Sequence, residues 1–323
     1  MSGGDLRETR ATAVARDEYL RKLFTPSFIS STLREYGLSL KKRFGQNFLI
    51  NKNIAERIVD YAGITGEDVV LEIGPGLGVL TFLLAQRAKQ VIAVEIDGGV
   101  ARYLEDAVRK LGYRNILIVN RDFLGIDAAR FVHSPGKQPS GSGGLGEVLG
   151  PAKVVSNLPY SIGIKTILKT LSEIPTIESI TCMVQRDIAE RLAGGPGSKN
   201  YSAVSVLVQY RADIRVFEKS IAPGNFFPAP DVVSAVIQVK PKRDDSGIDR
   251  IVFEKIVRAG FANRRKNLVS NLVTAGVIAE RDRAFDFVMR RFQDPKIRAE
   301  KLSVADFVEL TKVLAEHREN FLQ

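Results

Sequence analysis

The sequence predicts an α/β fold with a doubly wound, mostly parallel, Rossmann-like sheet and a smaller all-helical domain at the C-terminus. Three observations predict it. From residue 68, short apolar runs alternate with helical spacing. A glycine-rich turn, residues 74–78, separates the first run from the segment after it. Beyond residue 241 only helical spacing remains. Short apolar strands alternating with helices indicate βαβ units and a sheet that is buried on both faces.

The strands are expected where apolar and β-branched residues run together for four to eight positions. These runs lie at residues 69–73, 91–95, 116–119, 153–155, 179–184, 203–210 and 234–239. We expect the last two to close the sheet with antiparallel pairing. Helices are expected where apolar residues recur three and four positions apart, at 54–62, 79–88 and 100–111.

Composition divides the chain into three parts. Residues 1–35 are polar and form an N-terminal extension, which we expect to pack on the surface or to stay mobile, with a helix around 16–24. Residues 36–240 form the sheet domain, with a flexible Gly/Ser/Pro-rich insertion at 134–151. Residues 241–323 form the helical domain, which begins at a Pro- and Ser-containing segment. Its helices are expected at 251–259, 265–274, 284–291 and 304–315.

The bulk composition restricts the function. The net charge of +10 favours a polyanionic partner such as nucleic acid, although simple solubility explains it as well. The one cysteine, Cys182, excludes an intramolecular disulfide and fits a buried strand position. The two histidines lie far apart, so we expect no metal site. No apolar run nears the ~20 residues of a membrane span, and no export signal is evident, so we expect a cytoplasmic protein.

The glycine-rich turn follows a strand and precedes a helix, and its glycines let the backbone bend sharply beside a ligand. A dinucleotide fingerprint would place its third glycine at position 79, which is Val79. The observed spacing is instead Glu72-x-Gly74-x-Gly76-x-Gly78. This variant is typical of adenosylmethionine sites.

Two acids follow the next two strands. Glu95 ends the second strand, seventeen residues after Gly78, and can accept hydrogen bonds from both hydroxyls of a ribose. Asp122 follows the third strand and can accept a hydrogen bond from an adenine amino group. The alternatives are a solvated strand-end carboxylate for Glu95, and Asp106 or Asp127 in place of Asp122.

The tetrapeptide Asn157-Leu158-Pro159-Tyr160 follows a later strand and suits a methyl-accepting amine. The Asn157 side chain and the backbone carbonyls of Leu158 and Pro159 can accept hydrogen bonds from both N–H groups of an amine such as adenine N6. That grip favours a pyramidal nitrogen and frees its lone pair. Tyr160 offers a ring on which an extruded base can stack. The alternative is an ordinary Asn/Pro turn.

Phe226 and Phe227 precede a proline turn and provide a second candidate wall for the base. On spacing, Phe226 is the better candidate to lie opposite Tyr160. The alternative is that both rings fill the core under the turn.

From about residue 38, the chain resembles the ribosomal RNA adenine dimethyltransferases that modify two adjacent adenines near the 3′ end of small-subunit rRNA. The matching stretches are 44–49, 72–78, 94–97, 122–123, 157–160, 183–186, 226–236 and 261–266. The resemblance implies an enzyme of ribosome biogenesis that forms N6,N6-dimethyladenosine. It also implies a monomer that acts on small-subunit rRNA or the pre-small ribosomal subunit, with no membrane.

The resemblance also implies the site residues. The cofactor, S-adenosyl-L-methionine, would contact Asn47, Leu49, Gly74, Gly76, Gly78, Glu95, Ile96, Asp122 and Asn157. Asn157, Leu158, Pro159, Tyr160 and Phe226 would hold the target base. RNA would be contacted by the basic clusters Lys41-Lys42-Arg43 and Arg264-Arg265-Lys266, each of which can also be a solvated basic surface.

The chain departs from the family pattern in the long N-terminal extension, the Gly/Ser insertion, and Ala299 where proline is usual. Two alternatives stay open. One is a large-subunit rRNA adenine methyltransferase of the macrolide-resistance type. The other is a non-catalytic ribosome-assembly or transcription factor on the same fold, which should have lost cofactor residues such as Gly74, Gly76 and Glu95.

Overall fold

The computed structural model describes residues 3–39, 46–128, 152–243, 246–278 and 282–315. The predicted insertion at 134–151 and the cluster Lys41-Lys42-Arg43 lie outside the described residues. The chain divides into two compact units, one of residues 1–186 with 215–241 and one of residues 187–214 with 242–323. One junction between these units lies after Pro241, and residues 187–214, assigned above to the sheet domain, group with the helical unit.

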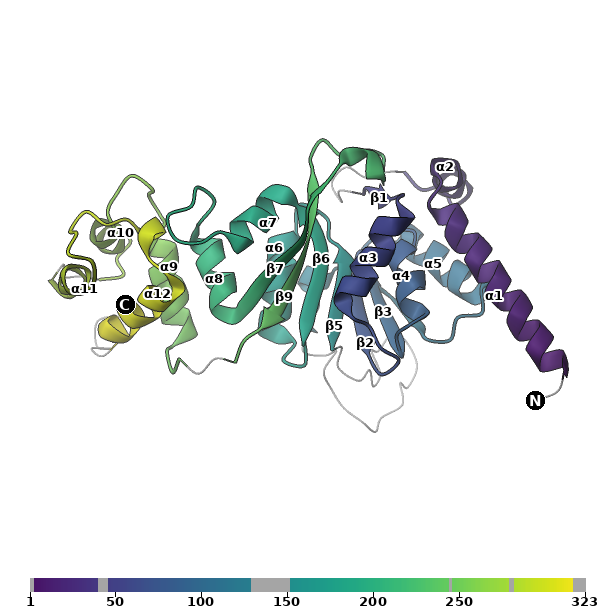
Figure 1. The fold of residues 1–323 in the computed structure, drawn as a ribbon, viewed down its shortest axis with the longest axis horizontal. Helices are drawn as coiled ribbons and strands as arrows, with labels where there is room; N and C mark the ends of the chain where they lie inside the picture. The colour runs from purple at the N-terminus through teal and green to yellow at the C-terminus, as the bar shows by residue number, and fades with distance from the viewer. Residues whose placement is uncertain (1–2, 40–45, 129–151, 244–245, 279–281, 316–323) are drawn as a thin grey trace. The chain divides into compact units, whose positions relative to one another are not determined.

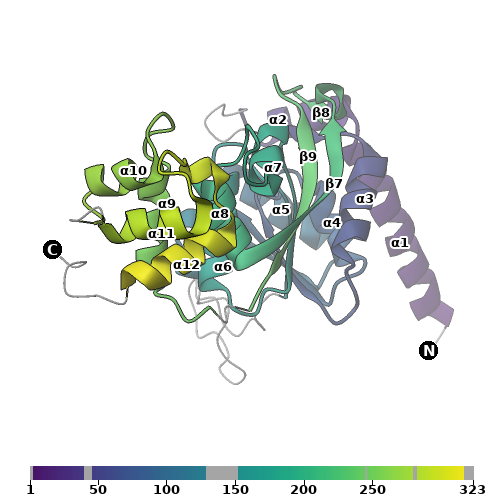
Figure 2. The same cartoon turned by 60° about the vertical axis from the view of Figure 1, so that its left-hand side comes forward.

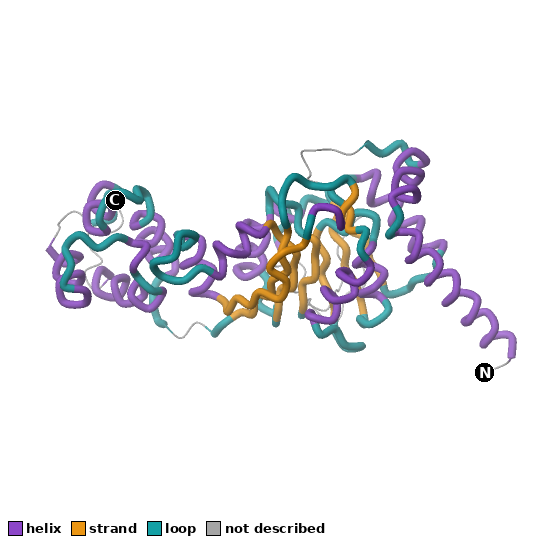
Figure 3. The backbone as a smooth tube through the Cα atoms, turned by 45° about the horizontal axis from the view of Figure 1, so that its top comes forward, coloured by secondary structure: helices purple, strands orange, loops and turns teal. Residues whose placement is uncertain are grey.

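The described part of the chain holds one large sheet, whose strands are drawn in orange in Figure 3. Its seven strands lie in the order β4-β3-β2-β5-β6-β9-β7. Neighbours from β4 to β6 are parallel, and β9 is antiparallel to β6. Their bounds are β2 Val69–Ile73, β3 Gln90–Glu95, β4 Ile116–Asn120, β5 Lys153–Asn157, β6 Ser179–Gln185, β7 Ala212–Ile221 and β9 Ser234–Pro241. The predicted doubly wound, mostly parallel sheet is confirmed. The strand order reverses between β2 and β5, where α/β folds bind ligands beyond the carboxyl ends of the strands.

The predicted strand at residues 203–210 is wrong, because the segment forms helix α8, Ala203–Arg211. The Ser202 N–H donates to Ser205 Oγ at 3.0 Å, which starts a helix. Val206 and Leu207 then pack into the core of the second unit. An apolar run of this length fits a buried helix or a strand equally, and the missed strand β7 follows directly.

Three helices of the first unit, α3 Lys52–Ala62, α4 Val79–Ala85 and α5 Gly98–Lys110, pack on the sheet (Figure 1). Their apolar faces share one hydrophobic core with strand residues such as Val70 and Val155. Asn51 caps α3 by accepting from the Ile54 N–H at 3.2 Å. Two further helices, α6 Gly163–Glu173 and α7 Arg186–Ala193, follow β5 and β6 along the chain.

The N-terminal extension packs on this core, one of its two expected outcomes. It forms α1, Gly3–Leu23, and α2, Pro26–Glu35, and buries Leu23 and Ile29 completely. The Arg16 guanidinium lies 4.1 Å from the centre of the Tyr113 ring and donates to the Leu111 carbonyl at 2.9 Å. A cation that bonds the last carbonyls of α5 stabilises the end of that helix.

The second unit is helical, as predicted for residues 241–323 (Figure 2). After α8 it contains α9 Arg250–Gly260, α10 Leu268–Thr274, α11 Asp282–Phe292 and α12 Val304–Ala315. Phe253, Leu268 and Phe307 are buried in its core. Among the described residues, no helix has both the length and the apolar character needed to cross a bilayer.

Gly78→Ala tests the packing of the turn. Gly78 has φ +90°, and an added Cβ would lie 2.7 Å from Phe82 Cε2 and 2.9 Å from Leu104 Cδ2. The backbone strain and the overpacking together predict a fall of about 2–4 kcal/mol in the free energy of unfolding, measured by urea titration. Gly66→Ala is the matched control, because Gly66 has open space around its Cα, and it should change stability by less than about 0.5 kcal/mol. Equal losses in the two variants would contradict this account.

Candidate active site

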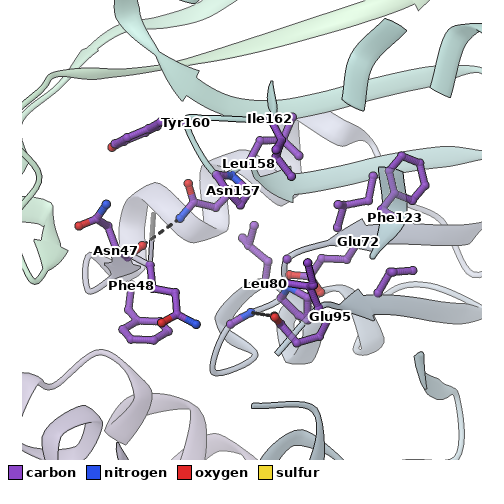
Figure 4. Close-up of a pocket in the computed structure, with 18 of the residues that line it drawn as sticks. Asn47, Phe48, Glu72, Leu80, Glu95, Phe123, Asn157, Leu158, Tyr160 and Ile162 are labelled. Carbon is purple, nitrogen blue, oxygen red and sulfur yellow. Dashed lines mark hydrogen bonds between the residues drawn. The ribbon is translucent and has the colours of Figure 1, made fainter. Parts of the chain in front are cut away.

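A cavity of about 310 Å³ opens at the carboxyl ends of β2, β3, β4 and β5 (Figure 4). Five segments line it: Gln46–Leu49, the turn region Glu72–Leu80 without Gly78, Val94–Ile96, Arg121–Leu124 and Asn157–Ile162. The glycine turn and the Asn157–Tyr160 loop therefore face one space. This is the arrangement that the two motifs predict if a cofactor and a target amine are to meet.

The glycine turn contacts the opposite side of the cavity closely. Gly74 and Gly76 have φ values of +70° and +56°, which favour glycine. A Cβ at Gly74 would lie 3.4 Å from Pro159 Cδ, and one at Gly76 would lie 3.1 Å from Phe48 Cε1. Side chains at these positions would close the cavity. Gly78 does not line the cavity. A glycine is needed there because Phe82 and Leu104 pack against its Cα.

Glu95 lies at the end of β3 and is only 4% exposed. Its Oε1 accepts from the Asp97 N–H at 2.9 Å, and its Oε2 accepts from the Gly76 N–H at 3.3 Å. The carboxylate thus links the second strand to the glycine turn. Burial raises the pKa of Glu95 to about 7, against the lowering effect of these backbone donors.

Glu72, in β2, is 1% exposed and also lines the cavity. The Thr81 hydroxyl donates to its Oε2 at 2.6 Å. Burial, together with the charge of Glu95, raises its pKa to about 8, against the lowering effect of the bond from Thr81. Glu72 marks the motif in the sequence but is predicted to have no role of its own, although an acid inside an otherwise apolar strand is itself a signal.

Asn157 ends β5, and its Nδ2 donates to the Asn47 carbonyl at 3.3 Å (Figure 4). This bond uses the donor of the amide and leaves Oδ1 available as an acceptor. The Leu158 N–H donates to the Met183 carbonyl at 3.0 Å, which continues the β5–β6 pairing into the loop. The predicted side-chain acceptor is therefore held at a cavity wall.

The loop ends in a tight turn. The Pro159 carbonyl accepts from the Ile162 N–H at 3.1 Å, so one of its lone pairs is already used. The Tyr160 hydroxyl lies 2.9 Å from Ser234 Oγ on β9, which fixes a half-buried ring at the cavity wall.

Phe226 does not line the cavity, and this corrects the expectation that it faces Tyr160 across the base. Its side chain is 3% exposed and lies in the hydrophobic core. Phe226 and Phe227 form the short strand β8, which pairs antiparallel with β1, Phe48–Leu49. That pairing places Phe226 opposite Leu49 and turns its ring inward, which is the alternative that the sequence left open.

The remaining predicted residues divide between the two units. Asn47, Leu49, Ile96 and Asp122 all line the cavity, as expected. Asp122 is exposed and caps the turn Phe123–Gly125 by accepting from the Leu124 N–H at 2.9 Å. The apolar lining is not predicted by the sequence, because it has no motif of its own. Its residues are Leu77, Val79, Leu80, Phe123, Leu124 and Ile162.

The basic cluster Arg264-Arg265-Lys266 is exposed, in the second unit, in the turn before α10 and not in the expected helix. Arg264 Nη2 donates to the Lys199 carbonyl at 3.0 Å, so this residue has a structural partner. Lys266 Nζ lies 3.4 Å from Thr274 Oγ1.

The cavity fits S-adenosyl-L-methionine. The bare turn at Gly74 and Gly76 leaves room for a ligand, and Glu95 offers a buried acceptor beside it. The apolar lining suits an adenine ring. Among the described residues, no group of three or more His, Cys, Asp or Glu can hold a metal ion.

Fold and cavity together define the class of the protein, an adenosylmethionine-dependent methyltransferase. Comparison with known proteins then narrows the class. The family model described as ribosomal RNA adenine dimethylase matches residues 37–316, and the chain belongs to this family. It is accordingly an enzyme that methylates adenine in ribosomal RNA.

Two curated relatives are called ribosomal RNA small subunit methyltransferase A. The protein of Bacillus thuringiensis is 35% identical over 303 residues, which cover 93% of this chain and 99% of the relative. That of Geobacillus thermodenitrificans is 37% identical over 302 residues, covering 91% and 97%.

Two solved structures share the fold. A dimethyladenosine transferase from Plasmodium falciparum has a TM-score of 0.69 at 22% identity and covers 85% of this chain and 99% of its own. The 23S rRNA methyltransferase ErmE has a TM-score of 0.60 at 25% identity and covers 83% and 99%.

The two buried acids predict how the stability of the cofactor-free enzyme depends on pH. Their folded-state pKa values lie above the unfolded value, so their contribution to stability is complete below about pH 4.5 and is lost as the pH rises through 7 to 8. Glu72→Gln removes one of these losses. Urea unfolding between pH 5 and 8.5 should show a shallower decline for this variant, by up to about 1.4 kcal/mol per pH unit. Glu105→Gln, on an exposed face of α5, should follow the wild type; parallel curves for all three proteins would refute the prediction.

Proposed function

We propose that this enzyme transfers methyl groups to N6 of two adjacent adenines near the 3′ end of small-subunit rRNA, giving N6,N6-dimethyladenosine. The cavity that joins the glycine turn to the Asn157–Tyr160 loop carries this proposal, since a methyl donor and an exocyclic amine can meet there. The two curated relatives, aligned over more than nine-tenths of the chain, support the small subunit as the target. In this proposal the enzyme is a cytoplasmic monomer that acts on the pre-small ribosomal subunit during ribosome biogenesis.

Asn157 positions the amine. S-adenosyl-L-methionine, when bound, supplies a methyl group activated by the sulfonium. Asn157 Oδ1 accepts one N–H of the amine, and the backbone carbonyls of Leu158 and Pro159 offer further acceptors. The grip turns the nitrogen lone pair out of conjugation with the ring. Asn157 Nδ2 donates to the Asn47 carbonyl, so Asn157 Oδ1 is already oriented before the base binds.

Tyr160 provides the surface for the flipped adenine. Its ring lines the cavity next to Asn157, and its hydroxyl is fixed by Ser234. An aromatic ring held in this way loses little entropy when a base stacks on it, and stacking is worth about 1–3 kcal/mol. Phe226 supports this site through the core and does not touch the base.

The cofactor is held by the opposite half of the cavity. Glu95 would accept hydrogen bonds from the ribose hydroxyls, and the backbone of Gly74 and Gly76 would hold the amino-acid chain of the cofactor. Asp122 is placed for the adenine amino group, because Leu124 N–H uses only its Oδ1. Ile96, 45% exposed in the cavity wall, gains an apolar neighbour when the adenine ring binds. Asn47 and Leu49 complete the wall.

Mass spectrometry of rRNA tests the target. Isolated small and large ribosomal subunits are incubated separately with the enzyme and isotopically labelled adenosylmethionine. We expect two dimethylated adenines near the 3′ end of the small-subunit rRNA and no label in the large subunit. Label in the large subunit would indicate the macrolide-resistance type, and label in neither would leave an assembly factor as the better account.

Asn157→Ala should reduce methyl transfer by about 10²–10³-fold, because it removes an acceptor that acts on the reacting amine. The dissociation constant of adenosylmethionine, measured by calorimetry, should stay within about tenfold. Asn157→Asp is the informative companion, since it keeps an oxygen but loses the donor to the Asn47 carbonyl. Wild-type turnover in Asn157→Ala would refute the role of Asn157.

Binding to small-subunit rRNA should weaken steeply with salt, as expected for a chain of net charge +10. Arg265 is exposed, and among the described residues its guanidinium has no protein partner. Arg265→Ala should therefore reduce the magnitude of the log–log salt slope by about one and leave stability unchanged. Arg264→Ala is the matched contrast, because loss of its bond to the Lys199 carbonyl should lower stability. A slope unaffected by Arg265→Ala would remove this residue from the RNA-binding surface.

A further inference from the structure

The cavity contains two buried carboxyl groups, whereas the basic side chain among its described lining residues, Arg121, is exposed. Glu72 is 1% exposed and Glu95 is 4% exposed, and both line the same space (Figure 4). In the described part of the chain, neither acid forms an ion pair with a lysine or arginine. A buried carboxylate without a counter-charge is costly. The cavity therefore suits a ligand that brings positive charge with it.

The two acids differ in what already holds them. Each oxygen of Glu95 accepts a backbone N–H, from Gly76 and from Asp97, and these bonds stabilise its ionised form. Glu72 has the Thr81 hydroxyl on one oxygen. Glu72 is thus the acid whose ionisation depends more strongly on a ligand.

The cofactor and its product differ by one charge. Adenosylmethionine carries a sulfonium, whereas the product, adenosylhomocysteine, has a neutral thioether in its place. Both share the ribose, the adenine, the ammonium and the carboxylate. A group that senses the sulfonium distinguishes the two, and a group that serves the ribose does not.

We propose that Glu72 is neutral in the empty enzyme and releases its proton to solvent when adenosylmethionine binds, so that it favours the cationic cofactor over the neutral product. The ionised carboxylate then balances the sulfonium across the cavity. Once the methyl group has left, this charge pair is lost, and Glu72 must either take up a proton or remain a buried anion. Either course weakens the hold on the product and assists its exchange for new cofactor.

Other charged groups face the cavity from the neighbouring elements. Glu95 lies on β3, and Asp97, at the start of α5, contacts Glu95 through its N–H. Arg121 and Asp122 follow β4, and both are exposed. Tyr160 follows β5. Thr81, on α4, holds Glu72 and does not titrate. Solvent screens the exposed groups. Glu95 is proposed to contact the ribose, which cofactor and product share, so its contribution cancels in the ratio of their dissociation constants.

The direct test is calorimetry of ligand binding to the whole enzyme without RNA. Adenosylmethionine and adenosylhomocysteine are each titrated at pH 6.5 in buffers of different ionisation enthalpy, which gives the number of protons released. We expect the wild type to release between about half a proton and one proton with adenosylmethionine, and much less with adenosylhomocysteine, because one group whose pKa is displaced on binding releases up to one proton.

The pH dependence of affinity provides the second readout. Between about pH 6 and 7 the dissociation constant of adenosylmethionine should fall by up to tenfold per pH unit relative to that of adenosylhomocysteine. The α-amino group of each ligand also titrates, and the sulfonium lowers its pKa in adenosylmethionine alone. The slopes are therefore compared below about pH 7, where both amines stay protonated.

Glu72→Gln is the decisive variant. Glutamine has the shape of the neutral acid and can still accept from Thr81, so the fold should be retained; unfolding curves check this. The proton release and the slope of the affinity ratio should both disappear in Glu72→Gln and persist in Glu105→Gln, which alters an exposed acid of α5.

Three results would overturn the proposal: no proton release by the wild type, release unchanged in Glu72→Gln, or equal release with both ligands. The last would mean that Glu72 senses the shared ammonium. If Glu72→Gln did not fold, the wild-type comparison of the two ligands would still decide. None of these outcomes bears on the choice of rRNA target.

Discussion

The site depends on one buried hydrogen bond between two neighbouring strand ends. The Ile73 N–H, at the end of β2, donates to Ser156 Oγ on β5 at 2.9 Å. Backbone pairing between these strands joins Val70 to Lys153 and Leu71 to Val154. Beyond these paired residues, the fully buried Ser156 side chain connects the two strands in place of a backbone hydrogen bond. It holds the start of the glycine turn at a fixed distance from Asn157, and so it sets the separation between the two motifs that face the cavity.

The fold subjects the acids of the cavity to opposing demands. A parallel sheet covered on both faces is dry, which makes an ionised Glu72 or Glu95 costly in the empty enzyme. The same dryness strengthens any attraction to a cationic ligand. The same burial therefore has two consequences. It lowers the stability of the empty enzyme at high pH, and it raises the affinity of the site for a cationic ligand.

The parts of the fold that the sequence predicted are those that local pattern determines. The strands at 69–73 and 91–95 are short, continuous and apolar, and glycines at 74 and 76 leave few alternatives to a ligand-binding turn. Residues 203–210 were wrongly predicted because Val206 and Leu207 would be buried in either kind of element, and only the tertiary core decides. The ring of Phe226 could not be placed, because its partner Leu49 lies far away in sequence. An acid in an apolar strand marks Glu72 in the sequence, but its burial and its bond from the Thr81 hydroxyl become visible only in the fold.

The wall around Asn47 shows why a core residue can belong to a functional motif. Asn51 Nδ2 donates to Asn225 Oδ1 at 2.8 Å, and the Ile50 N–H donates to the Asn225 carbonyl at 2.8 Å. These bonds and the β1–β8 pairing attach the 46–51 segment to residues 225–227. Phe226 anchors that attachment in the core, so its packing helps to determine where the Asn47 carbonyl meets the Asn157 amide. The core position of Phe226 thus links the packing of the sheet unit to the position of the cavity wall.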